Sequence, residues 1–122
     1  EAEAILEILE KFEIGDILFA DSQSQKDRLW EMRRKVGEAV KSHSVYIEED
    51  TVVPRYRLPD LLNGVKSIGK KYGFKSVCYG HAGDGNLHVN ILRGDLSEKE
   101  WTEDLPLWIS EIFELTVSLG GT

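Results

Sequence analysis

Cysteine, histidine and proline are scarce in this chain of 122 residues, which has one cysteine, three histidines and three prolines. An internal disulfide needs two cysteines, so the single Cys78 cannot form one, and we expect a reducing compartment, the cytoplasm. No apolar run approaches the roughly 20 residues that would span a bilayer, and we therefore expect no transmembrane segment.

Basic residues are also few, 15 against 22 acidic residues, which gives a formal net charge of -7. Binding to phosphate backbones needs a basic surface, so nucleic acid is excluded as a partner. The length suits one domain, residues 1–122, with one modest core. The chain opens directly on a helical pattern and stops at Gly120-Gly121-Thr122 as if entering a turn. We expect a piece of a longer polypeptide.

The apolar spacing predicts helices alternating with short strands. Helices are expected at 2–12, at 23–41, from Pro59 to a stop at Gly73, and after Pro106, with Ser97 and Glu100 forming a capping box. Strands are expected at 17–20, 45–47, 75–79 and 87–92. Because the last two strands flank a glycine turn, they form an antiparallel hairpin. We predict an α+β fold with helices on one face of an antiparallel sheet, in a ferredoxin-like arrangement.

The segment from Tyr79 to Leu92 holds two of the three histidines, three glycines and two asparagines. Strand side chains alternate between faces, so Asn86, His88 and Asn90 share one face of the strand. In a symmetric turn His81 would pair with His88. Directly paired residues have Cβ atoms about 4.5–5.5 Å apart, so both imidazoles could bind one zinc, manganese or iron ion.

Two histidines do not complete such a site, because a catalytic metal normally has three protein ligands. The alternative is a pair of hydrogen-bonded histidines that shapes the turn. Asp84, between two glycines, is interpreted as a turn residue. A strand follows the glycines, which rules out a dinucleotide-binding or P-loop phosphate cradle, and a calcium loop would need further ligands.

Arg33 interrupts the apolar stripe of the second predicted helix, between Leu29 and Val36. It either clamps a substrate carboxylate with two hydrogen bonds or packs its stem while its head reaches water. The neighbouring Trp30 is expected in the core. The acidic run 48–50 is interpreted as a solvated turn and Cys78 as a small buried apolar residue.

Four stretches together resemble the C-terminal domain of FAD-linked oxidases, the family that includes glycolate oxidase, D-lactate dehydrogenase and D-2-hydroxyglutarate dehydrogenase. The stretches are Gly80-His81-Ala82-Gly83-Asp84-Gly85-Asn86-Leu87-His88, Leu29-Trp30-Glu31-Met32-Arg33, Glu49 to Pro54 with Arg57-Leu58-Pro59, and Ile112 to Thr122. The resemblance implies a parent enzyme with an FAD-binding domain in the same polypeptide. Such enzymes oxidise a 2-hydroxy acid by moving hydride from its Cα to the flavin.

The resemblance also implies roles for particular residues. His81 and His88 would be catalytic and would hold a divalent metal, whose third ligand is a Glu in a Glu-His-Gly segment beyond Thr122. Arg33, Asn90 and Asn86 would bind the substrate. The 2-hydroxyglutarate enzymes have a basic residue where this chain has acidic Glu48-Glu49, which favours a glycolate- or lactate-like substrate.

The resemblance allows a homodimer or electron-transfer subunits as further partners. It implies an isolated fragment that is inactive, because nothing in it holds a flavin. A second hypothesis, independent of the resemblance, is a non-catalytic ferredoxin-like module that binds a metal or small ligand and regulates a partner.

Overall fold

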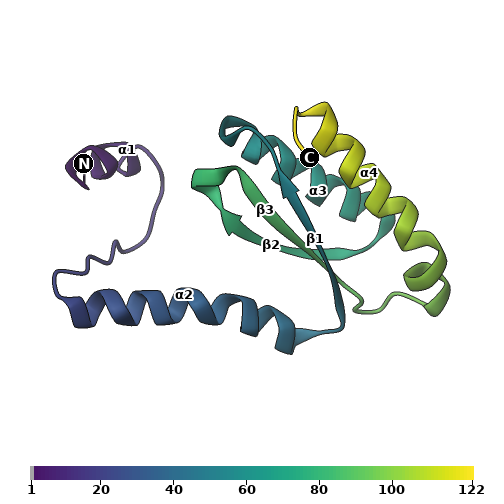
Figure 1. Ribbon diagram of the computed structural model, residues 1–122, viewed down its shortest axis with the longest axis horizontal. Helices are drawn as coiled ribbons and strands as arrows, with labels where there is room; N and C mark the ends of the chain where they lie inside the picture. Colours follow the sequence, from purple (N-terminus) through teal and green to yellow (C-terminus); the bar gives the residue numbers. More distant parts are fainter. Residues whose placement is uncertain (1) are drawn as a thin grey trace. The chain divides into compact units, whose positions relative to one another are not determined.

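The computed structural model describes residues 2–122 and divides the chain into two compact units, Glu1–Lys35 and Val36–Thr122. The first unit contains helix α1 (Ala2–Leu9) and the start of helix α2 (Gln23–His43). The second contains the remaining helices and the three strands, which Figure 1 labels along the chain.

The first unit lacks the strand that the sequence predicts at 17–20. Ile17, Leu18 and Phe19 belong to no helix or strand, and Leu18 is 72% exposed. None of the described side chains from residue 3 to residue 35 is buried, and Trp30 is 53% exposed, so its expected place in the core is wrong. A strand needs a neighbour to satisfy its backbone groups, and an apolar run without one gains nothing from extension.

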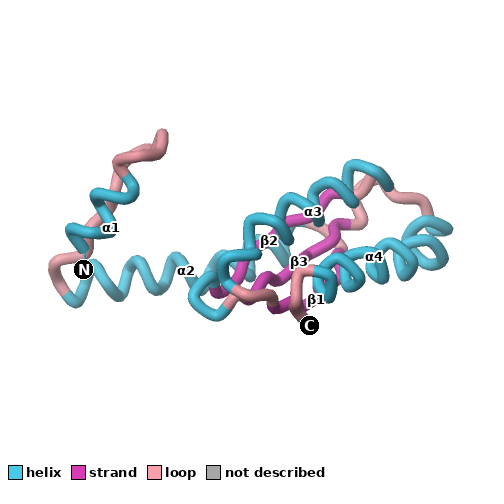
Figure 2. The backbone as a smooth tube through the Cα atoms, turned by 90° about the horizontal axis from the view of Figure 1, so that it is seen from above, coloured by secondary structure: helices cyan, strands magenta, loops and turns pink. Residues whose placement is uncertain are grey.

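The second unit is built on a three-stranded antiparallel sheet. Its strands are β1 (Tyr46–Val52), β2 (Lys75–His81) and β3 (Asn86–Leu92), in the order β1-β3-β2. Helices α3 (Leu58–Tyr72) and α4 (Leu105–Ser118) pack against each other and lie along the same side of the strands (Figures 1 and 2). The predicted α+β class with helices on one face of an antiparallel sheet is confirmed. The order β-α-β-β-α supplies five of the six elements of a ferredoxin-like unit.

One hydrophobic core joins the sheet to both helices. Leu61 and Val65 of α3, Ile112 of α4, and Val89 and Ile91 of β3 are all fully buried in it. Every second side chain of β3 therefore packs into the core. The side chains between them lie on the opposite face of the sheet.

The helix ends follow the local signals in the sequence. Gly73 ends α3 in the left-handed region, with φ 83°, as its position predicts. The Ser97 amide donates to Glu100 Oε2 at 2.8 Å and the Glu100 amide donates to Ser97 Oγ at 3.3 Å, which confirms the capping box. The helix that this box begins passes through a short π-helical turn, Glu100–Asp104, into α4.

Strand β1 is longer than the sequence predicts and takes in the acidic run 48–50. The interpretation of that run as a solvated turn is wrong, because each of its residues pairs with one of β3. Glu49 faces the helices, where burial raises the pKa of its carboxyl group. Glu48 and Asp50 face the other way.

The last residues of the chain return to β1. Val52 and Thr122 donate their backbone N–H groups to each other's carbonyl oxygens, both at 2.9 Å. Such a reciprocal pair is the hydrogen-bonding pattern of antiparallel strands. The backbone at Thr122 therefore runs along the outer edge of β1. No helix among residues 2–122 is long and apolar enough to cross a membrane.

The core position of β3 gives a stability prediction. Ile91→Ala removes fully buried atoms, and we expect the free energy of unfolding to fall by about 2–5 kcal/mol. Val77→Ala, on the opposite face and 36% exposed, should cost less than about 1 kcal/mol. Urea titration followed by circular dichroism measures both. Equal losses would contradict this assignment of the two faces.

Candidate functional site

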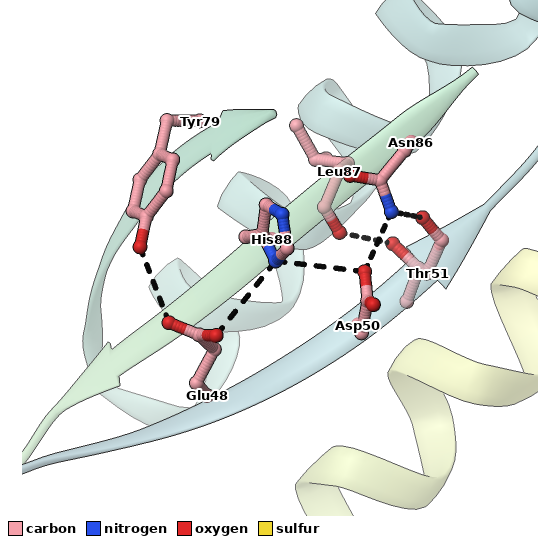
Figure 3. Close-up of polar contacts among 7 residues, drawn as sticks. All are labelled: Glu48, Asp50, Thr51, Tyr79, Asn86, Leu87 and His88. Atoms are coloured by element: carbon pink, nitrogen blue, oxygen red, sulfur yellow. Dashed lines mark hydrogen bonds and ion pairs between the residues drawn. The ribbon is translucent and has the colours of Figure 1, made fainter. Parts of the chain in front are cut away.

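The face of the sheet that points away from α3 and α4 carries most of the polar side chains that the sequence singles out. We call it the polar face and define it by Glu48 and Asp50 of β1, Tyr79 and His81 of β2, and Asn86, His88 and Asn90 of β3. Figure 3 shows Glu48, Asp50, Tyr79, Asn86 and His88 together on their three strands. The alternation predicted for β3 is confirmed, because Leu87, Val89 and Ile91 are buried in the core.

The pairing of β2 with β3 differs from the prediction. Tyr79 lies opposite His88, and His81 lies opposite Asn86. The expected pairing of His81 with His88 is wrong because the turn is tighter than assumed. Residues 82–84 form a 3₁₀ turn, and Gly85 closes it in the left-handed region with φ 73°. The error in register is two residues, an even number, so every side chain keeps its predicted face.

The two imidazoles nevertheless lie near each other. His81 is diagonal to His88 across the strand pair, and their ring centroids are 5.9 Å apart, with an angle of 74° between the ring planes. Diagonal neighbours on an antiparallel pair are within reach of aromatic and other long side chains. Both rings are on the same side of the sheet, as a shared ion would require.

Two carboxylates from β1 lie beside His88. Its Nδ1 atom is 3.5 Å from Asp50 Oδ1 and 3.7 Å from Glu48 Oε1 (Figure 3). The ring of Tyr79 lies against the imidazole, with 5.3 Å between centroids, and its hydroxyl donates to Glu48 Oε2 at 3.2 Å. His88 is thus in contact with side chains from both neighbouring strands.

Asn86 holds the carboxylate of Asp50 in place. Its Nδ2 donates to Asp50 Oδ1 at 2.6 Å and to the Thr51 carbonyl oxygen at 3.3 Å (Figure 3). Thr51 is itself buried and donates its hydroxyl to the Leu87 carbonyl at 2.7 Å. These bonds tie the end of β1 to β3 beside the glycine turn.

Asn90 is the most unusual residue of this face. It is fully buried, and neither its side-chain oxygen nor its side-chain nitrogen has a hydrogen-bond partner among the described residues. An unsatisfied buried polar group costs about 1–3 kcal/mol, so native proteins keep few of them. The hydrogen-bonding capacity of this amide is therefore unused within the described residues.

Arg33 belongs to the first unit, where its side chain is exposed on α2. Its guanidinium carbon lies 5.2 Å from the centroid of the Trp30 ring, a cation–π contact. This contact explains why an arginine lies beside the apolar stripe of α2, although its side chain is not directed into a core. Its role in substrate binding stays a prediction.

The ligand set for a metal is incomplete in residues 2–122. Among these described residues, no group of three or more His, Cys, Asp or Glu side chains is arranged to hold a metal ion. Cys78 is on the opposite face, with the core, and burial raises the pKa of its thiol. It is partly buried and packs against the core, which differs from the buried position expected of it.

Comparisons with known proteins identify the family of the chain. The family model described as FAD linked oxidases, C-terminal domain, matches residues 1–122. The chain belongs to this family. The chain is 32% identical to glycolate oxidase subunit GlcD of Bacillus subtilis, over 100% of the chain and 26% of the relative.

Two further relatives carry different names. D-lactate dehydrogenase of Anaerostipes hadrus is 31% identical, over 87% of this domain and 22% of the relative. D-2-hydroxyglutarate dehydrogenase of Stutzerimonas stutzeri is 36% identical, over 70% of this domain and 18% of the relative. The chain thus spans about a quarter of the length of its relatives, or less.

Sequence reasoning missed the parts that Glu48 and Asp50 have on the polar face. The signal for the carboxylates was the apolar Tyr46-Ile47 before them and Val52-Val53 after them, which is compatible with one continuous strand.

The glycine turn provides a test of the site's geometry. A Cβ atom at Gly85 would lie 1.9 Å from the Val53 carbonyl oxygen, and the residue has φ 73°. We expect Gly85→Ala to lower the free energy of unfolding by more than about 1 kcal/mol and to shift the ¹H-¹⁵N amide signals of His81 and His88. Gly83→Ala, whose Cβ would meet nothing within 4 Å, is the control. Equal effects of the two substitutions would disprove the requirement for glycine at 85.

Proposed function

We propose that this domain is part of the substrate-binding half of an FAD-dependent oxidoreductase that oxidises a small 2-hydroxy acid, glycolate- or D-lactate-like. The buried amide of Asn90, which has no hydrogen-bond partner within the described part of the chain, carries the proposal, because a carboxylate or hydroxyl group of such a substrate would satisfy it. The family match over residues 1–122 supports the enzyme over a regulatory module. The FAD-binding domain of the same polypeptide would be its main partner, with a homodimer or electron-transfer subunits as further partners.

The polar face would orient the substrate for hydride transfer. Asn90 would hold its carboxylate, Asn86 would line the site, and an imidazole would accept the hydroxyl proton. Arg33, in the first unit, stays a candidate substrate-binding residue on the strength of the resemblance alone. The flavin, when bound, supplies the redox chemistry, and the protein supplies orientation and electrostatics.

His81 and His88 would hold a divalent metal, zinc, manganese or iron, which would supply Lewis-acid polarisation of the hydroxyl group. The common face and the ring separation of 5.9 Å support two ligands, and a third would come from a residue after Thr122. The pairing of Thr122 with Val52 supports this, because a chain continuing along β1 would pass beside Asp50 and Glu48. The proposed location is the cytoplasm.

Glu48 supports the choice of a monocarboxylate. Glu48 pairs with Asn90 across the two strands, and Asp50 lies two residues along the same strand. Each additional negative charge of a substrate would be repelled by these carboxylates, so a monocarboxylate is favoured over a dicarboxylate.

The proposal is tested in the parent enzyme with Asn90→Leu, a substitution of similar shape. We expect kcat/KM for glycolate or D-lactate to fall roughly ten- to a hundredfold, as for the loss of a hydrogen bond to a charged group. The free energy of unfolding should not fall, because the substitution removes an unsatisfied buried amide. Val77→Ala, whose residue pairs with Asn90 across the strands, is the control. An unchanged kcat/KM, with FAD still bound, would refute the role of Asn90.

A further inference from the structure

We propose that Glu48 and Asp50 are positioning residues that hold the neutral imidazole of His88 in its Nδ1–H tautomer. The lone pair then lies on Nε2. Glu48 and Asp50 would thus act on His88 without themselves binding the metal or the substrate. The consequence for metal or proton binding rests on the proposed function, whereas the tautomer itself does not.

The Nδ1 atom of His88 lies close to two carboxylates. The atom is buried, has no hydrogen-bond partner among the described residues, and lies 3.5 Å from one carboxylate oxygen and 3.7 Å from another. A lone pair on Nδ1 would face two negative charges at close range. A proton on Nδ1 would instead place positive charge beside these two carboxylates, so the electrostatics favour Nδ1–H. Catalytic hydrogen bonds are often long in the unliganded state and shorten when the site fills.

The carboxylates are themselves fixed in place. Asn86 Nδ2 donates to Asp50 at 2.6 Å, and the Tyr79 hydroxyl donates to Glu48 at 3.2 Å. Tyr79 also packs on the imidazole ring, with 5.3 Å between centroids. Ring and acceptors are therefore held by neighbouring strands of one sheet, and the preference does not depend on a mobile side chain.

Direct ligation by the carboxylates fits the geometry less well. Both approach the Nδ1 side of the ring, whereas the second nitrogen lies on the side away from them (Figure 3). Neither completes a group of three ligands among residues 2–122. A carboxylate on one imidazole nitrogen fixes the tautomer and raises the basicity of the other nitrogen, which is how such groups act in metal and proton-transfer sites.

Long-range ¹H-¹⁵N correlation spectra of the 122-residue chain test the tautomer directly, since ¹⁵N shifts distinguish the two neutral forms and the imidazolium. We expect His88 to be mainly Nδ1–H in the wild type. In Glu48→Gln/Asp50→Asn the Nε2–H form should become a major species, because both negative charges are gone. Asp50→Glu, which keeps the charge, should keep Nδ1–H. Glu49→Gln, on the opposite face of the same strand, is the matched control and should change nothing.

Two results would overturn the proposal: mainly Nε2–H in the wild type, or mainly Nδ1–H in the wild type and in the double variant alike. Titration of the same proteins with Zn²⁺ separates it from the proposed function. If the chain binds Zn²⁺, the double variant should bind it roughly 10- to 100-fold more weakly. If the wild type binds no Zn²⁺ while the tautomer result holds, the metal fails and the positioning role stands.

Discussion

The alternation of side chains along β3 is the constraint on which the rest of the structure depends. Leu87, Val89 and Ile91 are buried against α3 and α4, and their burial fixes which way the strand faces. A slip of one residue would expose these apolar side chains and bury the polar ones, a cost that the core does not permit. The core therefore determines that His88 and Asn90 lie on the polar face.

The other two strands complete this face from opposite sides. β2 brings Tyr79 and His81, which have the parity of His88, and β1 brings Glu48 and Asp50. The result is an imidazole with a ring neighbour on one side and two acceptors on the other, next to a buried amide with no partner among the described residues. An unsatisfied amide and two adjacent carboxylates both lower stability, and functional sites are where proteins retain such groups.

Local signals in the sequence predict much of this arrangement. The rest depends on contacts between distant parts of the chain, which the sequence pattern does not specify. The faces of β3, the end of α3 at Gly73 and the capping box at Ser97 follow from period and cap chemistry within a few residues. The register of the hairpin depends on the exact path of the turn at 82–85, which periodicity does not specify. The extension of β1 through three acidic residues depends on pairing with β3, a strand far away in the sequence. The run at 17–20 has strand composition but pairs with no strand among residues 2–122.

The most direct test of the central claim is a NOESY spectrum of the folded chain, read at the ring protons of His88. The structure predicts contacts with the ring protons of both Tyr79 and His81, at centroid distances of 5.3 and 5.9 Å. Contacts of the His88 ring with methyl groups of Leu61 or Ile112, in the core, would place the imidazole on the other face and contradict the account.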